Sequence, residues 1–155
     1  MGTNLQRKYK CLPQQVFING NYKLIPIRDE DKYAIMQWRN EQIEILRQKE
    51  VLTKEKQELY FSAVVNKLFE QEKPDQLLFS FLENDQLIGY GGLVHIDWES
   101  KNAEISFITA TERNTMGSEF NQIHGLNQMG CGSKFISDFN CYLTMIINIA
   151  YNFLN

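Results

Sequence analysis

The stretch Leu87–Ile108, LIGYGGLVHIDWESKNAEISFI, decides the fold of this chain. Apolar residues recur on both sides of the polar segment Trp98–Asn102, which is typical of two strands joined by a short turn. The second strand begins with a lone carboxylate, Glu104, set against the apolar residues that follow it. The stretch therefore predicts a hairpin that belongs to the core and also carries a candidate site residue.

Two further strands are predicted on the N-terminal side of this hairpin. Tyr22–Arg28 alternates as a strand does, and Pro26 indicates that it lies at a sheet edge or that the strand ends there. Leu77–Leu82 is a dense apolar run of strand length. The polar residues Glu83–Gln86 then predict a hairpin turn that leads into the stretch Leu87–Ile108.

Helices are predicted between the first and the second of these strands. Asp29 is a suitable N-cap, and the acidic residues after it suit the first turn of a helix. This helix runs to about Asn40, and a continuation over Glu41–Gln48 is left open. Thr53 is a second start signal, for a longer helix that stops before Pro74.

The C-terminal part of the chain changes in character after the hairpin. Thr111–Gly132 is rich in Asn, Gly, Ser and Thr, which predicts a loop of roughly twenty residues, a length that compact domains usually keep for a function. Lys134–Asn155 is predicted to be an amphipathic helix. Its expected buried face consists of Phe135, Phe139, Leu143, Ile146, Ile147, Ala150 and Leu154.

The composition is that of a single folded domain. The chain has 155 residues, of which 43% are hydrophobic and 12% aromatic, enough to bury a core. We predict an N-terminal arm over residues 1–21, in which Val16–Ile18 forms a short strand or packs as an extended segment, and one domain over residues 22–155. The formal net charge of −3 provides no basic field for a phosphate backbone, so nucleic acid is not an expected partner.

The cysteines and the apolar runs indicate a cytoplasmic protein. Cys11, Cys131 and Cys141 are odd in number and lack the spacing of a metal site, so no metal is predicted. The N-terminal residues contain no apolar signal region. The longest apolar run, Tyr142–Leu154, is interrupted by polar residues and is too short to cross a bilayer, so no membrane interaction is expected.

Two stretches of the chain carry a family resemblance. YKLIPIRDEDKYAIMQWRN, Tyr22–Asn40, and DQLIGYGGLVHIDWESKNAEISF, Asp85–Phe107, resemble the GNAT superfamily of acyl-CoA-dependent N-acetyltransferases, and in particular its bacterial ribosomal-protein and amino-sugar acetyltransferases. The predicted order of strand, two helices, three strands and a helix resembles the first two-thirds of that fold. The resemblance implies an α+β fold with a mixed, mainly antiparallel sheet and flanking helices. It also implies acetyl-CoA as co-substrate, with direct transfer of an acetyl group to a primary amine.

The resemblance assigns roles to residues of the last predicted strand. Glu104 matches a carboxylate that often serves, directly or through water, as the base for the incoming amine. An amine attacks a thioester only when it is neutral, so such a base is chemically needed. Phe107, Ile108 and Thr109 match the kinked backbone that faces the cofactor. Without the resemblance, a solvated carboxylate at the start of a strand is the favoured explanation of Glu104.

The pyrophosphate-binding loop of the family is harder to locate. Its form is Gln/Arg-x-x-Gly-x-Gly/Ala, placed directly after the fourth strand, and Arg113–Gly117 lacks the second glycine. Asn127–Ser133 has the glycine spacing and precedes the predicted last helix, so it is the favoured alternative. The corresponding cofactor-binding residues are Gly130, Cys131, Gly132 and Ser133. Two further options stay open, namely a phosphate held elsewhere and a phosphate not held at all.

The end of the first helix borders the acceptor pocket in the family. This position points to Trp38, Arg39 and Asn40 as substrate-binding residues, with Arg39 suited to a phosphate or carboxylate on the acceptor. Trp38 also suits a core position. His95 is either substrate-facing or a structural residue of its strand. The acceptor amine would belong to a nucleotide-linked amino sugar, a protein N-terminus or a small metabolite.

The family fold continues beyond the last predicted helix of this chain. Its next strand splays away from the fourth to open the cofactor cleft, and no counterpart follows before Asn155. We therefore expect a partial GNAT domain whose open sheet edge is covered by a partner or by a homo-oligomer. The alternative function is that of a truncated or degenerate GNAT domain without activity, which acts as a binding or assembly module.

Overall fold

A computed structural model describes residues 7–113 and 126–154, with side chains given up to Arg113 and from Phe135 to Asn152. Its strands form one antiparallel sheet in the order β1-β2-β3-β4-β5. The strands are β1 (Phe17–Asn19), β2 (Tyr22–Pro26), β3 (Leu77–Glu83), β4 (Gln86–Asp97) and β5 (Asn102–Thr109). The helices are α1 (Lys32–Glu41), α2 (Lys54–Tyr60), α3 (Asn66–Leu68) and α5 (Leu126–Leu154).

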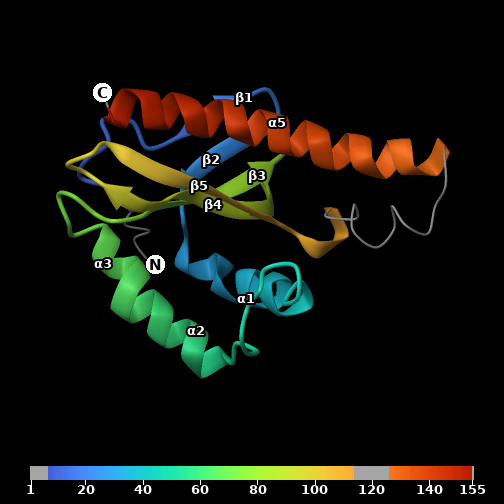
Figure 1. Cartoon of the computed structure of the whole chain (residues 1–155), viewed down its shortest axis with the longest axis horizontal. Coiled ribbons are helices and arrows are strands. Elements are labelled where there is room, and N and C mark those ends of the chain that lie inside the picture. Colours follow the sequence, from blue (N-terminus) through green and yellow to red (C-terminus); the bar gives the residue numbers. More distant parts are fainter. Residues whose placement is uncertain (1–6, 114–125, 155) are drawn as a thin grey trace.

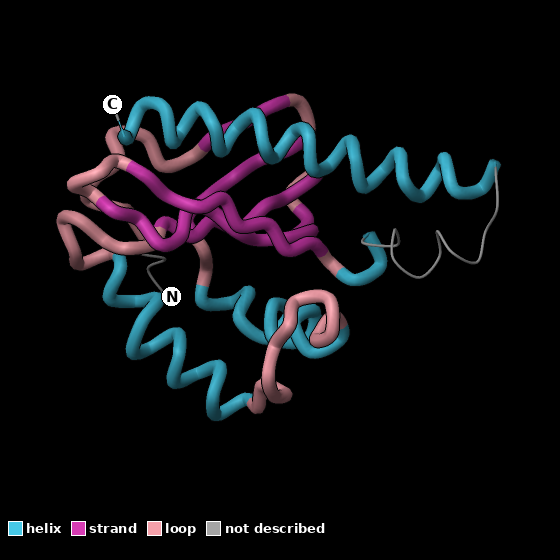
Figure 2. The backbone as a smooth tube through the Cα atoms, in the orientation of Figure 1, coloured by secondary structure: helices cyan, strands magenta, loops and turns pink. Residues whose placement is uncertain are grey.

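The helices cover the two faces of the sheet. Figure 1 shows α5 lying along one face, with its first turns extending beyond the strands, whereas α1, α2 and α3 lie against the other face. The same layers are seen in Figure 2, where the connection between α1 and α2 coils beside the end of α1. The predicted α+β class and order of elements are confirmed. No helix of the described ranges is long and apolar enough to span a membrane.

Both hairpins that the sequence predicts are present. Asn84 and Asp85, with φ of 51° and 65°, form the two-residue turn between β3 and β4. Positive φ at both central positions is the geometry that matches the twist of the flanking strands. At the next turn, Asp97 Oδ1 accepts hydrogen bonds from the backbone N–H groups of Glu99 (3.0 Å) and Ser100 (3.2 Å). Local turn chemistry therefore sets these connections.

The N-terminal residues complete the sheet where β2 ends. β1 pairs with β2, and β2 ends at Pro26, as the sequence analysis allowed for this proline. Beyond that point the Tyr9 hydroxyl donates to Leu78 O (2.6 Å) and accepts from Leu78 N (2.9 Å). Leu78 O also accepts from Ile27 N (3.1 Å), whereas Leu78 N donates to the hydroxyl of Tyr9, which is 1% exposed and replaces a strand partner for this N–H group.

The expected helix starts are only partly right. Thr53 caps α2, because its hydroxyl accepts from Lys56 N at 3.2 Å. The prediction that Asp29 caps the first helix is wrong, since Asp29–Asp31 form a 3₁₀ turn before α1 and Asp29 instead pairs with Lys32 at 3.3 Å. The open question over residues 41–48 is resolved as turns after Glu41, not as a further helix.

A buried carboxylate that the sequence analysis overlooked joins α1 to the sheet. Asp31 is 4% exposed. It accepts two 2.8 Å hydrogen bonds from the Arg28 guanidinium and one 2.7 Å bond from the Ser80 hydroxyl. Such bidentate, charge-assisted bonds are among the stronger ones in proteins. They hold the start of α1 against β3.

The predicted buried face of the last helix is rotated relative to the observed one. Ile146 is buried as expected, but Ile147 is 49% exposed. The residues of α5 that are buried against the sheet are Asp138, Tyr142, Met145, Ile146 and Ile149. Aromatic packing explains this rotation of the buried face. The Tyr142 ring lies 4.5 Å from the ring of Phe107 and 5.4 Å from the ring of Phe81.

The predicted boundary between the long loop and the last helix is wrong. α5 begins at Leu126, so Gly130–Ser133 lie inside the helix and not in a loop before it. Helix propagation from a packed segment adds one hydrogen bond per residue, which offsets the cost of about 1 kcal/mol for each glycine. Of the predicted loop, Thr111–Arg113 form a 3₁₀ turn, and residues 114–125 lie outside the described part of the chain.

Candidate functional site

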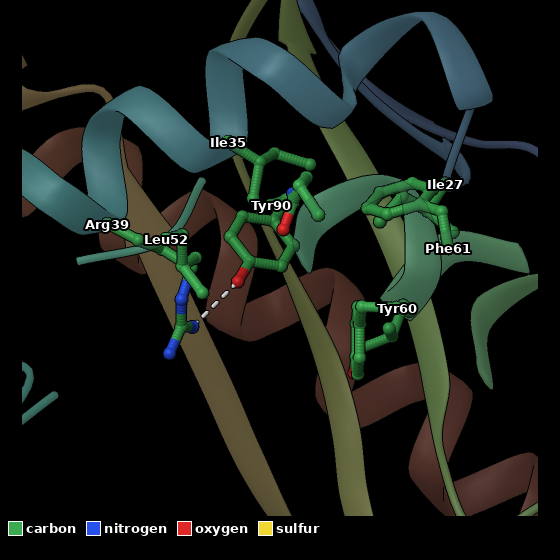
Figure 3. A pocket seen from close by; sticks show the side chains of 9 residues that line it. Ile27, Ile35, Arg39, Leu52, Tyr60, Phe61 and Tyr90 are labelled. Carbon is green, nitrogen blue, oxygen red and sulfur yellow. Dashed lines mark hydrogen bonds between the residues drawn. The ribbon is translucent and has the colours of Figure 1, made fainter. Parts of the chain in front are cut away.

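A cavity of about 230 Å³ lies between the sheet and the helices α1 and α2. Figure 3 shows that Tyr90 rises from the sheet at its centre, with Arg39 on one side and Tyr60 and Phe61 on the other. The lining residues are Ile27, Ile35, Arg39, Leu52, Gln57, Tyr60, Phe61, Leu78 and Tyr90. They come from segments that are far apart in the sequence, so only the folded chain assembles this site.

Helical and strand spacing explain how these side chains converge. Ile35 and Arg39 are four residues apart on α1, which places them on one side of the helix, toward the sheet. Tyr90 follows Gly89 on β4 and points toward α1 and α2. On the opposite face of β4, Gly91 leaves room for Tyr142 of α5. Gly91 thus leaves room for a side chain of α5, while Tyr90 lines the cavity on the other face.

Arg39 and Tyr90 form the polar part of the cavity. Arg39 Nη1 donates a hydrogen bond to the Tyr90 hydroxyl at 2.9 Å, and Arg39 Nε donates to Gln48 Oε1 at 3.2 Å. Burial raises the pKa of Tyr90, and the neighbouring charge of Arg39 partly offsets this rise. Tyr90 is therefore a neutral hydroxyl at physiological pH, held in place by a cation.

Asn40 does not line the cavity but holds part of its wall in place. Its side chain accepts from Leu52 N at 2.8 Å and donates to Leu52 O at 2.9 Å, which fixes the backbone just before α2. Gln48 also donates to Asn40 at 3.1 Å, so Asn40 and Arg39 share one partner. These bonds position Leu52 in the cavity wall. Trp38, the third residue predicted here, packs against the hydrophobic core.

The strand expected to face the cofactor runs beside the cavity. Ile108 is the pairing partner of Tyr90 across β4 and β5. Pairing is regular from Glu104 to Thr109, so the kink expected from the family is absent at these positions. The register shift lies on β4 instead, between Val94 and Asp97.

Two of the residues in this strand are engaged in structural contacts. The carbonyl of Thr109 accepts a 2.9 Å bond from Gln42 Nε2, and Gln42 is 4% exposed. The ring of Phe107 faces α5, where it lies 5.4 Å from Phe139. Within the described ranges, the outer side of β5 pairs with no other strand. Apart from the Thr109 carbonyl, which Gln42 occupies, backbone groups on this side are not paired with another described strand.

The structure separates Glu104 and His95 from the cavity. Glu104 is exposed and lies four residues from Ile108, which is about 13 Å along an extended strand. It shares a face of the sheet with Ile108, because alternate residues point the same way. His95 is exposed at φ of 50° inside the register shift on β4, beyond the reach of Tyr90. Neither residue lines the cavity.

The glycine motif does not provide the helix start that phosphate binding requires. Gly130, Cys131, Gly132 and Ser133 follow the first turn of α5. Backbone N–H groups beyond the first turn are bonded within the helix and are not free to bind an anion. The physical reason for assigning pyrophosphate to these residues is therefore removed.

Most residues of the cavity carry no functional signal in the sequence. Tyr90 belongs to the predicted hairpin, and nothing in the sequence marks Gln57 or Tyr60 as site residues. A tyrosine within the glycine-rich run GYGG was the one available signal, since glycine in a strand often marks a close approach of other groups. The apolar lining residues look like any other core residues in the sequence.

The family model for the acetyltransferase (GNAT) domain matches residues 24–152, which is most of the chain. The chain belongs to the GNAT acetyltransferase family. No curated protein sequence matches it.

Several solved structures are similar to this chain over part of their length. A ribosomal L7/L12 α-N-protein acetyltransferase in complex with coenzyme A is 11% identical, with 83% of this chain and 67% of that chain covered and a TM-score of 0.50. A dodecameric spermidine N-acetyltransferase from Vibrio cholerae is 23% identical, with 67% and 60% covered and a TM-score of 0.47. A chimera of that enzyme is 19% identical, with 66% and 58% covered and a TM-score of 0.49. The chain thus spans about three-fifths of the length of the two spermidine acetyltransferases.

Proposed function

We propose that this chain is an acetyl-CoA-dependent N-acetyltransferase whose acceptor amine binds in the cavity that Tyr90 lines. The observation that carries the proposal is the pairing of Tyr90 with Ile108. Directly paired residues lie about 4.5–5.5 Å apart, so the wall of the cavity adjoins the strand that the family resemblance assigns to the cofactor. Membership of the GNAT family supports the same chemistry.

In a direct transfer, different residues of this chain would have different roles. Bound acetyl-CoA supplies the activated acetyl group. The backbone of β5 near Ile108 would hold its arm, while the apolar cavity walls keep the amine out of bulk water. Glu104 lies on the same face of β5 as Ile108, and we propose that it receives the amine proton through intervening water.

Calorimetry with acetyl-CoA, together with an assay for released thiol in the presence of primary amines, tests the activity. We expect binding heat from acetyl-CoA alone and amine-dependent thiol release. Binding heat without thiol release on any amine would contradict transferase activity and favour the binding module. The absence of both would contradict the proposal as a whole.

Replacing Glu104 by Gln tests its role. General base catalysis contributes typically 10²–10⁴-fold, and a base that acts through water falls at the lower end, so we expect kcat to fall about 10²-fold. KM for the amine should change little, because Glu104 does not line the cavity. Glu99→Gln, in the exposed turn before β5, is the matched control. Equal kcat in both variants would show that Glu104 is not the base.

We also propose a cellular compartment and an oligomeric state for this chain. Cys11 and Cys141 are both free thiols, which supports a reducing compartment such as the cytoplasm. The outer side of β5, open within the described ranges, supports a homo-oligomer that covers this edge. Sedimentation over a range of protein concentrations would detect such an oligomer, and a concentration-independent monomer would contradict it.

A further inference from the structure

The charge of Arg39 is not balanced by any described acid. No carboxylate in residues 7–113 or in the described side chains of α5 forms an ion pair with it. The acid nearest in the chain, Glu41, accepts instead from the Thr111 hydroxyl. The partners of Arg39 are the neutral groups of Gln48 and Tyr90. A half-buried guanidinium with only neutral partners favours an anion.

Two hydrogen-bond donors are directed at the same place. Because Tyr90 accepts from Arg39, its own hydroxyl hydrogen is available to donate, and no described group accepts it. A guanidinium has five N–H groups, of which two are used in the bonds to Gln48 and Tyr90. The geometry thus offers a fork of donors with no acceptor, which is the complement of a carboxylate.

The rest of the cavity limits the size and polarity of the occupant. Its other walls are mostly apolar, formed by Ile27, Ile35, Leu52, Phe61 and Leu78. The volume of about 230 Å³ is below the range of roughly 300–1,000 Å³ that is usual for drug-sized ligands. A single positive charge among apolar walls matches one negative charge, so a carboxylate monoanion suits it better than a phosphate dianion.

We propose that the acceptor is a small amine that also carries a carboxylate on an apolar body, as an apolar α-amino acid does. Arg39 and Tyr90 bind the carboxylate, and Arg39 is the residue that determines this specificity. The inference rests on the proposed acetyl transfer and narrows its substrate class. A polyamine is disfavoured, because its positive charges would meet the unpaired charge of Arg39.

The first experiment uses the unmodified protein and paired amines. Leucine is compared with 3-methylbutylamine, which is leucine without its carboxylate, in the presence of acetyl-CoA. We expect kcat/KM to be 10- to 100-fold higher for leucine, in line with hydrogen bonds to a charged group. Equal or better turnover of 3-methylbutylamine or spermidine would overturn the proposal. A preference for O-phosphoethanolamine would likewise overturn the choice of a carboxylate.

A binding experiment separates this inference from the acetyl-transfer activity. Calorimetry with 4-methylpentanoate, which has the carboxylate and apolar body but no amine, needs no turnover. Binding of this acid without any acetyl transfer would keep the carboxylate site and contradict the transferase. Transfer to amines with no detectable binding of the acid would keep the transferase and overturn the carboxylate site.

Variants of Arg39 assign the effect to this residue. Arg39→Gln should weaken binding of 4-methylpentanoate at least tenfold and remove the preference for leucine, whereas Arg39→Lys should restore part of both. Lys49→Gln removes one positive charge from the exposed segment before α2 and is the matched control. Unchanged binding in a folded Arg39→Gln variant would overturn the role of Arg39.

Discussion

Gly91 lies on β4 beside Tyr142 of α5. A Cβ atom added there would lie 2.6 Å from the Tyr142 hydroxyl and closer still to the carbonyl of Ser106. The Tyr142 hydroxyl donates to that same carbonyl, so neither group can move away without loss of a buried hydrogen bond. The absence of a side chain at this position is what allows α5 to pack on the strands.

Gly91→Ala is therefore expected to destabilise the protein strongly. Overpacking typically costs 1–3 kcal/mol, and because both obstacles are rigid we expect a loss of about 3 kcal/mol in urea unfolding. Gly20→Ala is the control, since it meets no atom within 4 Å but must hold a φ of 63°. That variant should lose only about 1–2 kcal/mol. Equal losses of stability in the two variants would show that contact with α5 is not what excludes a side chain at Gly91.

At the scale of elements, a buried ionic network joins α5 to β2, to the end of β3 and to the turn after β5. Asp138, which is 1% exposed, accepts from Arg113 at 2.9 Å and from the Tyr22 hydroxyl at 2.6 Å. Arg113 also donates to Glu83 at 2.6 Å. One arginine thus links the end of β3, the turn after β5 and the middle of α5. The arrangement complements the aromatic packing of Tyr142 along the same helix.

Asp138→Ala should weaken this attachment of α5. Removal of one partner from a buried ion pair typically costs 3–5 kcal/mol, and since Arg113 keeps Glu83 we expect the lower value, about 3 kcal/mol, in urea unfolding. Asp85→Asn removes the charge from the surface pair with Lys23, in which the Asp85 side chain is 80% exposed, and keeps a residue that tolerates the φ of 65° at this turn, so it should cost less than about 1 kcal/mol. Similar costs for the two variants would contradict a structural role for the network.

The elements themselves were largely predictable, and the reasons are local. The hairpin in Leu87–Ile108 follows from alternating apolar residues and from a turn in which the Asp97 carboxylate accepts two backbone N–H groups. Thr53 was recognised as a cap because a hydroxyl beside free N–H groups needs no tertiary partner. Asp29 has the same local signal but pairs with Lys32. The spacing of apolar residues predicts the wrong buried face for α5. The packing of Tyr142 against the sheet, and not helical periodicity alone, determines which face is buried.

At the scale of the whole molecule, buried tyrosines couple stability to alkaline pH. Burial raises the pKa of Tyr9, Tyr90 and Tyr142 above their ordinary values. In the unfolded chain a tyrosine loses its proton near pH 10, while the folded protein keeps it. Their contribution to stability is therefore complete below about pH 10 and is lost as the pH rises above it.

We expect the free energy of unfolding to fall above about pH 10, by up to about 1.4 kcal/mol per pH unit for each of these tyrosines. Tyr9→Phe should reduce the slope by the contribution of one tyrosine. It should also lower stability by about 2 kcal/mol at neutral pH, because Leu78 loses both of its hydrogen bonds to the hydroxyl. Urea titrations at several pH values measure both effects. An unchanged slope in Tyr9→Phe would contradict the coupling.

The candidate site was less predictable than the fold. Arg39 was identified from its place at the end of the first helix, and it does line the cavity. Glu104 and His95 were chosen from the same hairpin that defines the fold, yet both are exposed and lie away from the cavity. A residue's position along a strand does not reveal which neighbouring helix will cover it.

The sequence alone determined the two hairpins and the cap at Thr53, because alternation, turn chemistry and helix caps act over a few residues. The GNAT family and its α+β class followed from the resemblance of two stretches of the chain. Only the tertiary structure decided where the cavity lies and which groups meet in it. Arg39 and Tyr90 are 51 residues apart in the chain. Their contact exists because α1 is held to β3 through Asp31 while β4 turns Tyr90 toward α1, and packing of this kind depends on long-range complementarity that no local pattern encodes.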